Sequence, residues 1–428
     1  MKTRPARSNG EAALCLSILQ FLLKDHHPRD YAIRLWDGSV WDAEPGQPVR
    51  FTMVIRHPGS LRTMLMAQSE NAMGQAYVYD DFDIEGDMES AMSMAEHLFR
   101  LRLSIGDRLR LASQLFRLPV HQKERSGRQA AKLEGTVHSI ERDRQAVTYH
   151  YNTSNDFFSF FLDKRMVYSC AYFAAPEEDL ETAQNRKLDY TCRKLRLHKG
   201  DRLLDIGCGW GGLIIYAAKK YKVSALGVTL SKPQADLANE HILKAGLSDR
   251  CRVEVCDYRQ IAGHGSFDKI VSIGMVEHVG EPKLPEYFRQ AWRLLKPGGV
   301  FLNHGIAHPH LETRGQSFSQ AYIFPDGEPV PIHVSTRIAE DVGFEVRDVE
   351  SLREHYMLTA RHWVRRLEAH HAEAVHATDE ATYRAWRLYM SAAASQFAAG
   401  KYNIYQSLLV KPDHGKSGLP LTRADWYS

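Results

Sequence analysis

A glycine-rich stretch in the middle of the chain is the first candidate for chemistry. Residues 203–212 read Leu-Leu-Asp-Ile-Gly-Cys-Gly-Trp-Gly-Gly, an apolar run followed by closely spaced glycines. Together with the apolar segment 213–218, this pattern predicts a buried strand, a tight turn and a helix. The turn would lie at the carboxyl end of a parallel strand, where open α/β sheets bind their ligands. Glycines let the backbone approach a ligand closely, and Asp205 supplies a hydrogen-bond acceptor.

Three kinds of loop can be compared with this stretch. Gly207, Gly209 and Gly212 have the spacing of a dinucleotide-binding loop, but the acidic residue expected about 20 positions later is absent. A P-loop requires Gly-Lys-Ser/Thr, which is also absent. The glycines alone therefore leave the ligand open, and a purely structural turn remains an alternative. With Asp205 and Gly211, the pattern Asp-x-Gly-x-Gly-x-Gly resembles motif I of the class I S-adenosylmethionine-dependent methyltransferases.

The segments after this loop alternate between strand and helix patterns. Four further apolar runs predict strands, at residues 223–228, 252–255, 267–274 and 300–306. This alternation predicts an α/β domain with a doubly wound, mostly parallel sheet. Thr229 and Gln234 follow the second strand, where many methyltransferases hold the ribose hydroxyls with an acidic residue. Asp257 and Tyr258 follow the third strand, where an adenine would lie.

The region before residue 120 predicts a separate, smaller α+β domain. Asp37-Gly38 lies between alternating apolar and polar residues, which is a hairpin signal, and residues 51–56 supply another strand. Residues 61–103 have a helical pattern. The apolar run 13–23 predicts a buried or amphipathic helix, because Lys-Asp-His-His follows where a signal peptide would have small residues.

Composition and charge narrow the function classes. With 428 residues, 44% hydrophobic and 25% charged, the chain is an ordinary globular protein, and its net charge of +3 does not by itself imply nucleic-acid binding. The six cysteines have no metal-ligand spacing, so we expect no metal site and a reduced, cytoplasmic compartment. No apolar stretch reaches the ~18 residues that span a bilayer.

A basic region connects the two expected domains. From Arg100 to Arg144 the sequence has eleven lysines and arginines but only five acidic residues. The region is either a solvated connecting surface or a patch for anionic phospholipid headgroups, where each basic residue contributes about 1 kcal/mol. Leu111, Leu115 and Phe116 are interleaved with the charges and permit an amphipathic interfacial helix. Nucleic acid would use the same charges, but no recognised nucleic-acid-binding motif accompanies them.

Further motifs occur in one order between Val147 and Val410. They are His150-Tyr151 with Asn155 and Phe157-Phe158, Tyr168-Ser-Cys-Ala-Tyr172, the glycine-rich loop, Gly227-Val-Thr-Leu-Ser231, Glu277-His-Val-Gly280, His304-x-Ile306 and Tyr322-Ile-Phe-Pro325. Together they resemble the cyclopropane-fatty-acyl-phospholipid synthases and their mycolic-acid relatives. Gly74-Gln-Ala-Tyr77 also resembles the N-terminal region of the phospholipid-acting members.

The resemblance implies a reaction and a set of site residues. It implies transfer of the S-adenosylmethionine methyl group to the cis double bond of an unsaturated phospholipid acyl chain, followed by deprotonation and closure of a cyclopropane ring. The implied cofactor-binding residues are Tyr168, Ser169, Asp205, Gly207, Cys208, Gly209, Trp210, Gly211, Thr229, Leu230, Gln234, Asp257 and Tyr258. The implied base is a bound bicarbonate held by Cys170, Glu277, His304, the backbone N–H of Ile306, and Tyr356. Aromatic faces around Tyr151, Phe157, Tyr168 and Tyr172 suit stabilisation of the cation formed on the acyl chain.

Composition and the resemblance together predict an organisation and partners. The expected parts are an N-terminal lipid-handling domain at 1–120, a basic linker at 121–146, the methyltransferase domain at 147–412 and a mobile C-terminal tail at 413–428. The expected partner is a membrane phospholipid met at the inner face of the membrane, with a homodimer as a family-level expectation and no nucleic acid. Asp326-Gly-Glu-Pro-Val-Pro331 departs from the family pattern, which predicts a different acyl chain or headgroup. The rivals are a non-cyclising fatty-acid C-methyltransferase and a non-catalytic lipid-binding protein.

Overall fold

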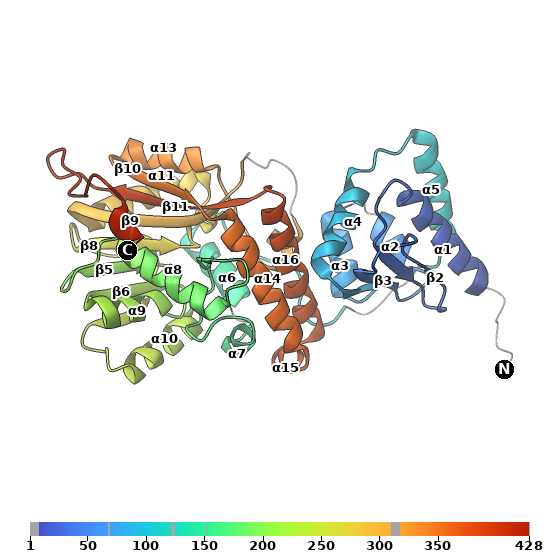
Figure 1. The fold of residues 1–428 in the computed structure, drawn as a ribbon, viewed down its shortest axis with the longest axis horizontal. Helices are drawn as coiled ribbons and strands as arrows, with labels where there is room; N and C mark the ends of the chain where they lie inside the picture. Colours follow the sequence, from blue (N-terminus) through green and yellow to red (C-terminus); the bar gives the residue numbers. More distant parts are fainter. Residues whose placement is uncertain (1–7, 67–68, 121–124, 152, 310–316, 428) are drawn as a thin grey trace. The chain divides into compact units, whose positions relative to one another are not determined.

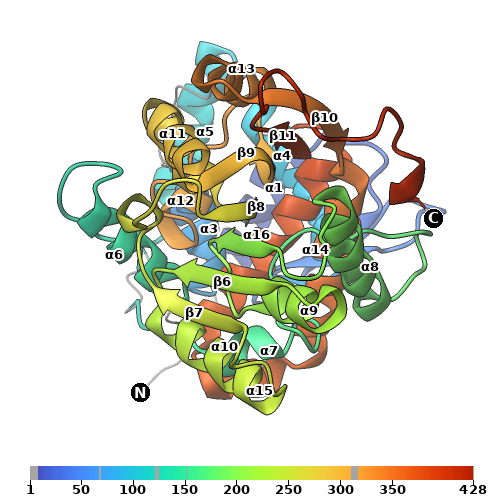
Figure 2. The same cartoon turned by 90° about the vertical axis from the view of Figure 1, so that its left-hand side faces the viewer.

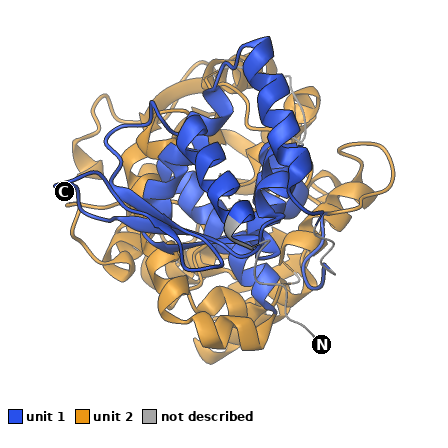
Figure 3. Cartoon of the chain, turned by 90° about the vertical axis from the view of Figure 1, so that its right-hand side faces the viewer, with its two compact units in different colours: residues 1–130, 316–322, 379–395 blue, residues 131–315, 323–378, 396–428 orange. Residues whose placement is uncertain are grey.

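The computed structural model describes residues 8–66, 69–120, 125–151, 153–309 and 317–427 (Figure 1). The chain divides into two units (Figure 3). One unit contains residues 1–130, 316–322 and 379–395, and the other contains residues 131–315, 323–378 and 396–428. The domain boundaries expected from the sequence stay predictions. In the structure, the N-terminal unit also includes two segments from the second half of the chain.

A seven-stranded sheet organises the larger unit. Its strands are β5 (Arg202–Ile206), β6 (Ser224–Thr229), β7 (Cys251–Val255), β8 (Phe267–Ile273), β9 (Leu295–Ala307), β10 (Glu345–Ser351) and β11 (Asn403–Val410). Their order is β10-β11-β9-β8-β5-β6-β7. The five strands from β7 to β9 in this order are parallel, and β11 runs antiparallel to both β9 and β10. This arrangement confirms the doubly wound, mostly parallel sheet.

Helices cover both faces of this sheet because its strands are apolar on both faces (Figure 2). Leu203 belongs to the core on one face, with α8 (Leu180–Lys194), α9 (Gly212–Tyr221) and α10 (Lys232–Lys244). Its neighbour Leu204 belongs to the core on the other face, with α11 (Leu284–Leu294) and α13 (Ile332–Val342). The loops at the carboxyl ends of the strands are thereby held on a rigid layered scaffold.

The same unit contains shorter elements around the sheet. They are α6 (Ile140–Tyr151), α7 (Asn155–Ser159), α14 (Arg353–Ala369), α15 (His371–Ala377) and the 3-10 helices η1 (Tyr258–Gln260), η2 (Val276–His278), η3 (Glu281–Lys283) and η4 (Ala424–Trp426). Trp426 is only 3% exposed and packs in the core beside α8, and its carbonyl accepts a hydrogen bond from Arg193 at 3.1 Å. The C-terminal segment is therefore docked at η4, which corrects the expectation of a mobile tail.

The N-terminal unit contains a four-stranded sheet in the order β2-β1-β3-β4. Its strands are β1 (Tyr31–Arg34), β2 (Val40–Trp41), β3 (Phe51–Ile55) and β4 (Phe82–Gly86), and its helices include α1 (Ser8–Leu22), α2 (Ser60–Met66), α3 (Glu70–Val78), α4 (Met88–Arg100), α5 (Ile105–Arg117) and α12 (Phe318–Tyr322). The predicted hairpin around Gly38 is confirmed, since β1 and β2 pair antiparallel. The prediction of continuous helical structure over 61–103 is wrong at β4, where Phe82-Asp-Ile-Glu alternates with the period of a strand.

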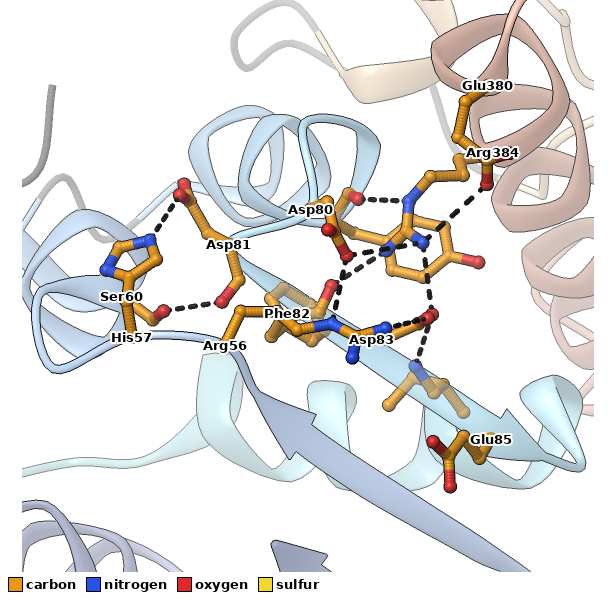
Figure 4. A network of polar contacts seen from close by, with 12 residues as sticks. Arg56, His57, Ser60, Asp80, Asp81, Phe82, Asp83, Glu85, Glu380 and Arg384 are labelled. Carbon is orange, nitrogen blue, oxygen red and sulfur yellow. Dashed lines mark hydrogen bonds and ion pairs between the residues drawn. The ribbon is translucent and has the colours of Figure 1, made fainter. Parts of the chain in front are cut away.

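Helix α16 (Glu380–Ala398) completes the N-terminal unit through residues 380–395. Arg384 is buried and donates hydrogen bonds to the carbonyl oxygens of Tyr77 (2.7 Å) and Phe82 (2.8 Å). Its guanidinium also lies 3.2 Å from the carboxylate of Asp83, within the polar network of Figure 4. Hydrogen bonds and a counter-charge together make burial of the arginine tolerable, so this late segment is fixed to the N-terminal sheet. Within the described residues, no helix is both long enough and apolar enough to cross a bilayer.

Candidate active site

A pocket lies at the carboxyl ends of β5, β6, β7 and β8, where an open α/β sheet binds ligands. Of the thirteen predicted cofactor residues, twelve line it: Tyr168, Ser169, Asp205, Gly207, Cys208, Gly209, Trp210, Thr229, Leu230, Gln234, Asp257 and Tyr258. The thirteenth, Gly211, is the N-cap of α9. Gly207 and Gly211 have φ angles of 81° and 77°, a backbone conformation that favours glycine. The glycines thus shape the turn that exposes the backbone to the pocket.

Two polar pairs occupy the walls formed after β6 and β7. The hydroxyl of Thr229 donates to Oε1 of Gln234 at 2.8 Å, and both side chains are buried. Asp257 is held by Arg259, whose Nη2 and Nε lie 2.7 Å and 2.8 Å from the two carboxylate oxygens. Arg259 also donates to Asp143 at 2.8 Å. The sequence predicts Thr229, Gln234 and Asp257 in the site. It does not predict Arg259, which also lines the pocket.

A buried lysine in the same pocket was also missed. Lys187 on α8 is 1% exposed, and its Nζ donates to Oγ of Ser169 at 2.8 Å. Burial lowers the pKa of Lys187 to about 8, with Asp163 opposing this effect. Burial raises the pKa of Asp205 to about 7, and the charge of Lys187 opposes that rise. The pocket thus contains a buried basic group and a buried acidic group. Such a pair can bind the carboxylate and the ammonium group of an amino acid, respectively.

The Glu277 carboxyl lies against the backbone of β9 at Gly305 and Ile306, and His304 is the preceding residue of that strand. Glu277 lies in η2, directly after β8, and His304 and Ile306 lie in β9. The carbonyl of His304 accepts the N–H of Gly274 at 2.8 Å. Burial raises the pKa of Glu277 to about 7, while the N–H groups of Glu277 itself and of Ile306 lower it. The N–H of Ile306 therefore reaches the Glu277 carboxyl.

Two polar atoms of this cluster lack partners. Among the described residues, neither Oε2 of Glu277 nor Nε2 of His304 has a hydrogen-bond partner, although both atoms are buried. The Glu277 residue is 9% exposed and His304 is fully buried. Buried polar atoms usually have partners, so this pair calls for an explanation such as a bound group. Gly305 leaves room here, because a Cβ at that position would lie 3.0 Å from Oε2 of Glu277.

Cys170 and Tyr356 both contact the backbone of Leu352 at the start of α14, one strand away from β9. The thiol of Cys170 lies 3.8 Å from the carbonyl oxygen of Leu352, which also accepts the N–H of Tyr356 at 3.0 Å. Leu352 donates to the carbonyl of Ile404, and Ile404 pairs with Ile306 across β11 and β9. Burial raises the pKa of Cys170, so its sulfur stays a neutral thiol and is not an activated nucleophile.

Aromatic rings form a continuous cluster beside the pocket. The ring of Phe158 lies 5.0 Å from Trp210 and 5.6 Å from Tyr168, and Tyr151 lies 5.9 Å from Trp210. Tyr151, Tyr168 and Trp210 line the pocket itself. Tyr172, also named from the sequence for its aromatic face, does not line the pocket. Its ring packs 4.6 Å from those of His355 and Tyr190, because α14 and α8 flank it.

The segment that departs from the family pattern also contributes to the pocket. Asp326 lines it and accepts hydrogen bonds from Nε and Nη2 of Arg142 at 2.6 Å and 2.9 Å. A bidentate pair of this kind fixes geometry as well as contributing energy. The motif residue His150 is tied to the preceding motif, Tyr322-Ile-Phe-Pro325, since its Nδ1 lies 2.7 Å from the carbonyl oxygen of Ile323.

The strand order and the glycine-lined pocket define a class I S-adenosylmethionine-dependent methyltransferase. Residues 138–407 match the family model described as mycolic acid cyclopropane synthetase, and the chain belongs to this family.

Three known proteins illustrate the relationship. A "probable fatty acid methyltransferase" from Pseudomonas putida is 38% identical over 402 residues, which cover 92% of this chain and 95% of the relative. The cyclopropane-fatty-acyl-phospholipid synthase of Escherichia coli is 38% identical over 257 residues, 60% of this chain and 65% of the relative. The crystal structure of mycolic acid cyclopropane synthase CmaA1 complexed with SAH and CTAB has a TM-score of 0.59 and 34% identity, over 62% of this chain and 97% of that chain.

Proposed function

We propose that this methyltransferase acts on the cis double bond of an unsaturated phospholipid acyl chain and closes a cyclopropane ring there. The observation that carries the proposal is the pair of buried, unpartnered atoms on Glu277 and His304, beside a cofactor pocket lined with aromatic rings. Ring closure, unlike simple methyl transfer to a heteroatom, needs a base that removes a proton after the transfer. The cluster supports the presence of such a base.

The cofactor pocket fits S-adenosylmethionine, which supplies an electrophilic methyl group. Lys187 and Asp205 present opposite charges for the amino-acid end of the cofactor, and Thr229 with Gln234 presents hydrogen-bonding groups after β6 for the ribose. Tyr258 supplies a ring after β7 for the adenine. The presence of SAH in the structure of CmaA1, a relative with 34% identity, supports this assignment.

The aromatic cluster suits the cation that forms on the acyl chain. An isolated double bond is a poor nucleophile, and the carbocation left after methyl transfer would react with water. Tyr151, Tyr168 and Trp210 offer ring faces that attract a cation without bonding to it. A proton then leaves the new methyl group, and the electrons of that C–H bond form the third side of the ring.

Bicarbonate is the base that we propose for the Glu277 and His304 cluster. The residues fit it, since a small oxyanion with one hydroxyl would give partners both to Oε2 of Glu277 and to Nε2 of His304. Cys170 and the N–H of Ile306 lie around the same strand ends. Because the pKa of Glu277 is about 7, its carboxyl can exchange a proton near neutral pH.

A membrane surface is the proposed source of the substrate. On α5, Ile105, Leu109 and Phe116 are 80%, 68% and 60% exposed and recur at helical spacing, whereas Leu111 and Leu115 are buried on the opposite face. The exposed arginines of the same helix, Arg108, Arg110 and Arg117, would meet anionic headgroups. An exposed apolar stripe bordered by cations supports peripheral binding to phospholipid rather than a solvated linker.

A second candidate is a fatty-acid methyltransferase that does not close a ring. It is favoured by the likeness to the Pseudomonas putida protein, which extends over 92% of this chain. In that reaction a hydride shift moves the cation along the chain, and loss of a proton gives a methyl-branched or exo-methylene alkene. An added reductant would convert this alkene to a methyl branch. The same pocket and aromatic cluster would serve both reactions.

Product analysis separates the two candidates. The purified protein is incubated with methyl-¹³C-labelled S-adenosylmethionine and vesicles of cis-monounsaturated phosphatidylglycerol, and the lipids are examined by mass spectrometry and proton NMR. The mass shows whether the label enters the phospholipid, and ring protons appear upfield of all other acyl signals. Ring signals support the synthase. Vinyl or methyl-branch signals from labelled lipid overturn it in favour of the second candidate, and unlabelled lipid refutes a phospholipid acceptor.

A further inference from the structure

Nδ1 of His304, the other ring nitrogen, contacts a buried glutamine. Gln406 on β11 lies directly opposite His304 on β9 in the strand register and is 1% exposed. Its Nε2 lies 3.3 Å from Nδ1 of the imidazole. An amide nitrogen only donates, so Nδ1 of His304 has to accept this hydrogen bond.

The orientation of the Gln406 amide is fixed from its other end. Nζ of Lys194 lies 2.9 Å from Oε1 of Gln406, and an ammonium group only donates. The amide oxygen must therefore face Lys194 and the amide nitrogen must face His304, which removes the usual ambiguity in placing a glutamine amide. Lys194 is fully buried on α8 and forms an ion pair with Glu350.

These contacts determine which ring nitrogen of His304 carries the proton. A neutral imidazole has one N–H, and the accepting role of Nδ1 leaves the proton on Nε2. Burial, together with the charges of Lys187 and Lys194, holds the pKa of His304 well below its ordinary value, which keeps the ring neutral. The proton therefore lies on the buried nitrogen that has no partner among the described residues.

We infer that Lys194 and Gln406 are positioning residues that hold His304 as an Nε2–H donor toward an oxyanion beside Glu277. The inference rests on the proposed function, because a donor at this place matters only if an anion such as bicarbonate binds there. Lys194 polarises the amide, and the amide fixes the tautomer without giving the imidazole a charge. A carboxylate in place of Gln406 would instead accept from Nδ1–H and leave Nε2 without a proton.

The tautomer can be measured directly, without any reaction. Wild-type protein with ¹⁵N-labelled histidine rings is examined by long-range ¹⁵N–¹H correlation, in which protonated and unprotonated ring nitrogens have well-separated shifts. The chain has 21 histidines, so the His304 signals are assigned by their loss in His304→Gln. We expect the Nε2–H form in wild type. A ring protonated at Nδ1, or at both nitrogens, overturns the inference, and this measurement needs no variant to fold other than His304→Gln.

Substitutions at Gln406 then test the cause. Gln406→Glu should move the proton to Nδ1, and Gln406→Leu should leave a mixture of tautomers. Ser407→Ala is the matched control, because Ser407 is the next residue of β11, is also buried and faces the opposite side of the sheet. It should retain the wild-type tautomer. An unchanged tautomer in both folded Gln406 variants overturns the inference.

Kinetics connect the tautomer to the site. In Gln406→Leu, the bicarbonate concentration for half-maximal ring formation should rise about tenfold, the effect of losing one hydrogen bond to a charged group. The half-maximal S-adenosylmethionine concentration should not change, which a general structural defect would not predict. An equal rise for both ligands overturns the positioning role. If wild type shows the expected tautomer but forms no ring, the proposed function fails and the hydrogen-bond arrangement stands.

Discussion

Glu277 should make the folded protein less stable at neutral pH than it would be with a neutral side chain. Burial raises its pKa from the ordinary 4.5 to about 7. Between these two pH values the folded protein keeps a proton that the unfolded chain has released. The free energy of unfolding therefore falls as the pH rises from about 4.5 to about 7, and the loss is complete above that range.

The magnitude follows from the size of the shift. One pKa unit corresponds to about 1.4 kcal/mol, so a shift from 4.5 to about 7 in a carboxyl that is 9% exposed costs about 3 kcal/mol at most. Glu277→Gln removes the ionisation and with it this cost. We compare the free energy of unfolding of the variant with that of wild type at each pH. The difference in favour of the variant should be up to about 3 kcal/mol larger at about pH 8 than at about pH 4.5. Comparing two pH values cancels effects of the amide that do not depend on pH.

Urea denaturation followed by circular dichroism, in bicarbonate-free buffer at several pH values, measures this difference. Glu373→Gln on α15 is the control, since that carboxylate is exposed and should show no comparable pH-dependent gain. A stability difference between Glu277→Gln and wild type that stays constant with pH would refute the reasoning. It would mean that Glu277 ionises normally and that burial does not raise the pKa of its carboxyl. The variant should also lose ring formation, so a gain in stability would accompany a loss of activity.

Three further substitutions test separate parts of the account. Gly305→Ala would put a Cβ 2.1 Å from Cγ1 of Val276. Ring formation should therefore fall at least about tenfold, while cofactor binding, measured by calorimetry, persists. A fully active variant would show that β9 is not crowded at Gly305. Trp426→Ala should lower the free energy of unfolding by about 3–5 kcal/mol in urea denaturation, because it leaves a cavity at a buried site beside Lys194. An unchanged free energy of unfolding would mean that the C-terminal tail is not docked. Phe116→Asp should weaken sedimentation with anionic vesicles by roughly tenfold or more, and unchanged binding would remove α5 from the membrane contact.

Local spacing was sufficient to predict the cofactor pocket. The segment 203–212 contains its own strand, turn and helix start, so its short-range pattern determines its conformation. The residues after β6 and β7, such as Thr229 and Asp257, follow because parallel strands end at one edge of the sheet. These parts of the site depend little on distant contacts, which is why a single sequence reveals them.

The parts that sequence reasoning missed depend on long-range contacts. Lys187 and Lys194 lie seven residues apart on the buried face of α8, and charged residues at apolar positions of a helix were a usable signal. The partners of Lys194, however, come from β10 and β11, more than 150 residues away, whereas Lys187 donates to Ser169. Tyr172 follows the Tyr-Ser-Cys motif in sequence, but its ring packs against α14, and no local pattern indicates that direction. The attachment of α16 through Arg384 to the N-terminal unit is of the same kind.

The central claim is that a base held by Glu277 and His304 closes the ring. The most direct test is a bicarbonate titration of the product mixture formed from methyl-¹³C-labelled S-adenosylmethionine and unsaturated phospholipid vesicles, with products separated by their NMR signals. In wild type, ring product should rise with bicarbonate and saturate, and Glu277→Gln and His304→Gln should lose this dependence. Ring formation at full rate in bicarbonate-free buffer, or labelled alkene as the product at every bicarbonate concentration, would contradict this claim.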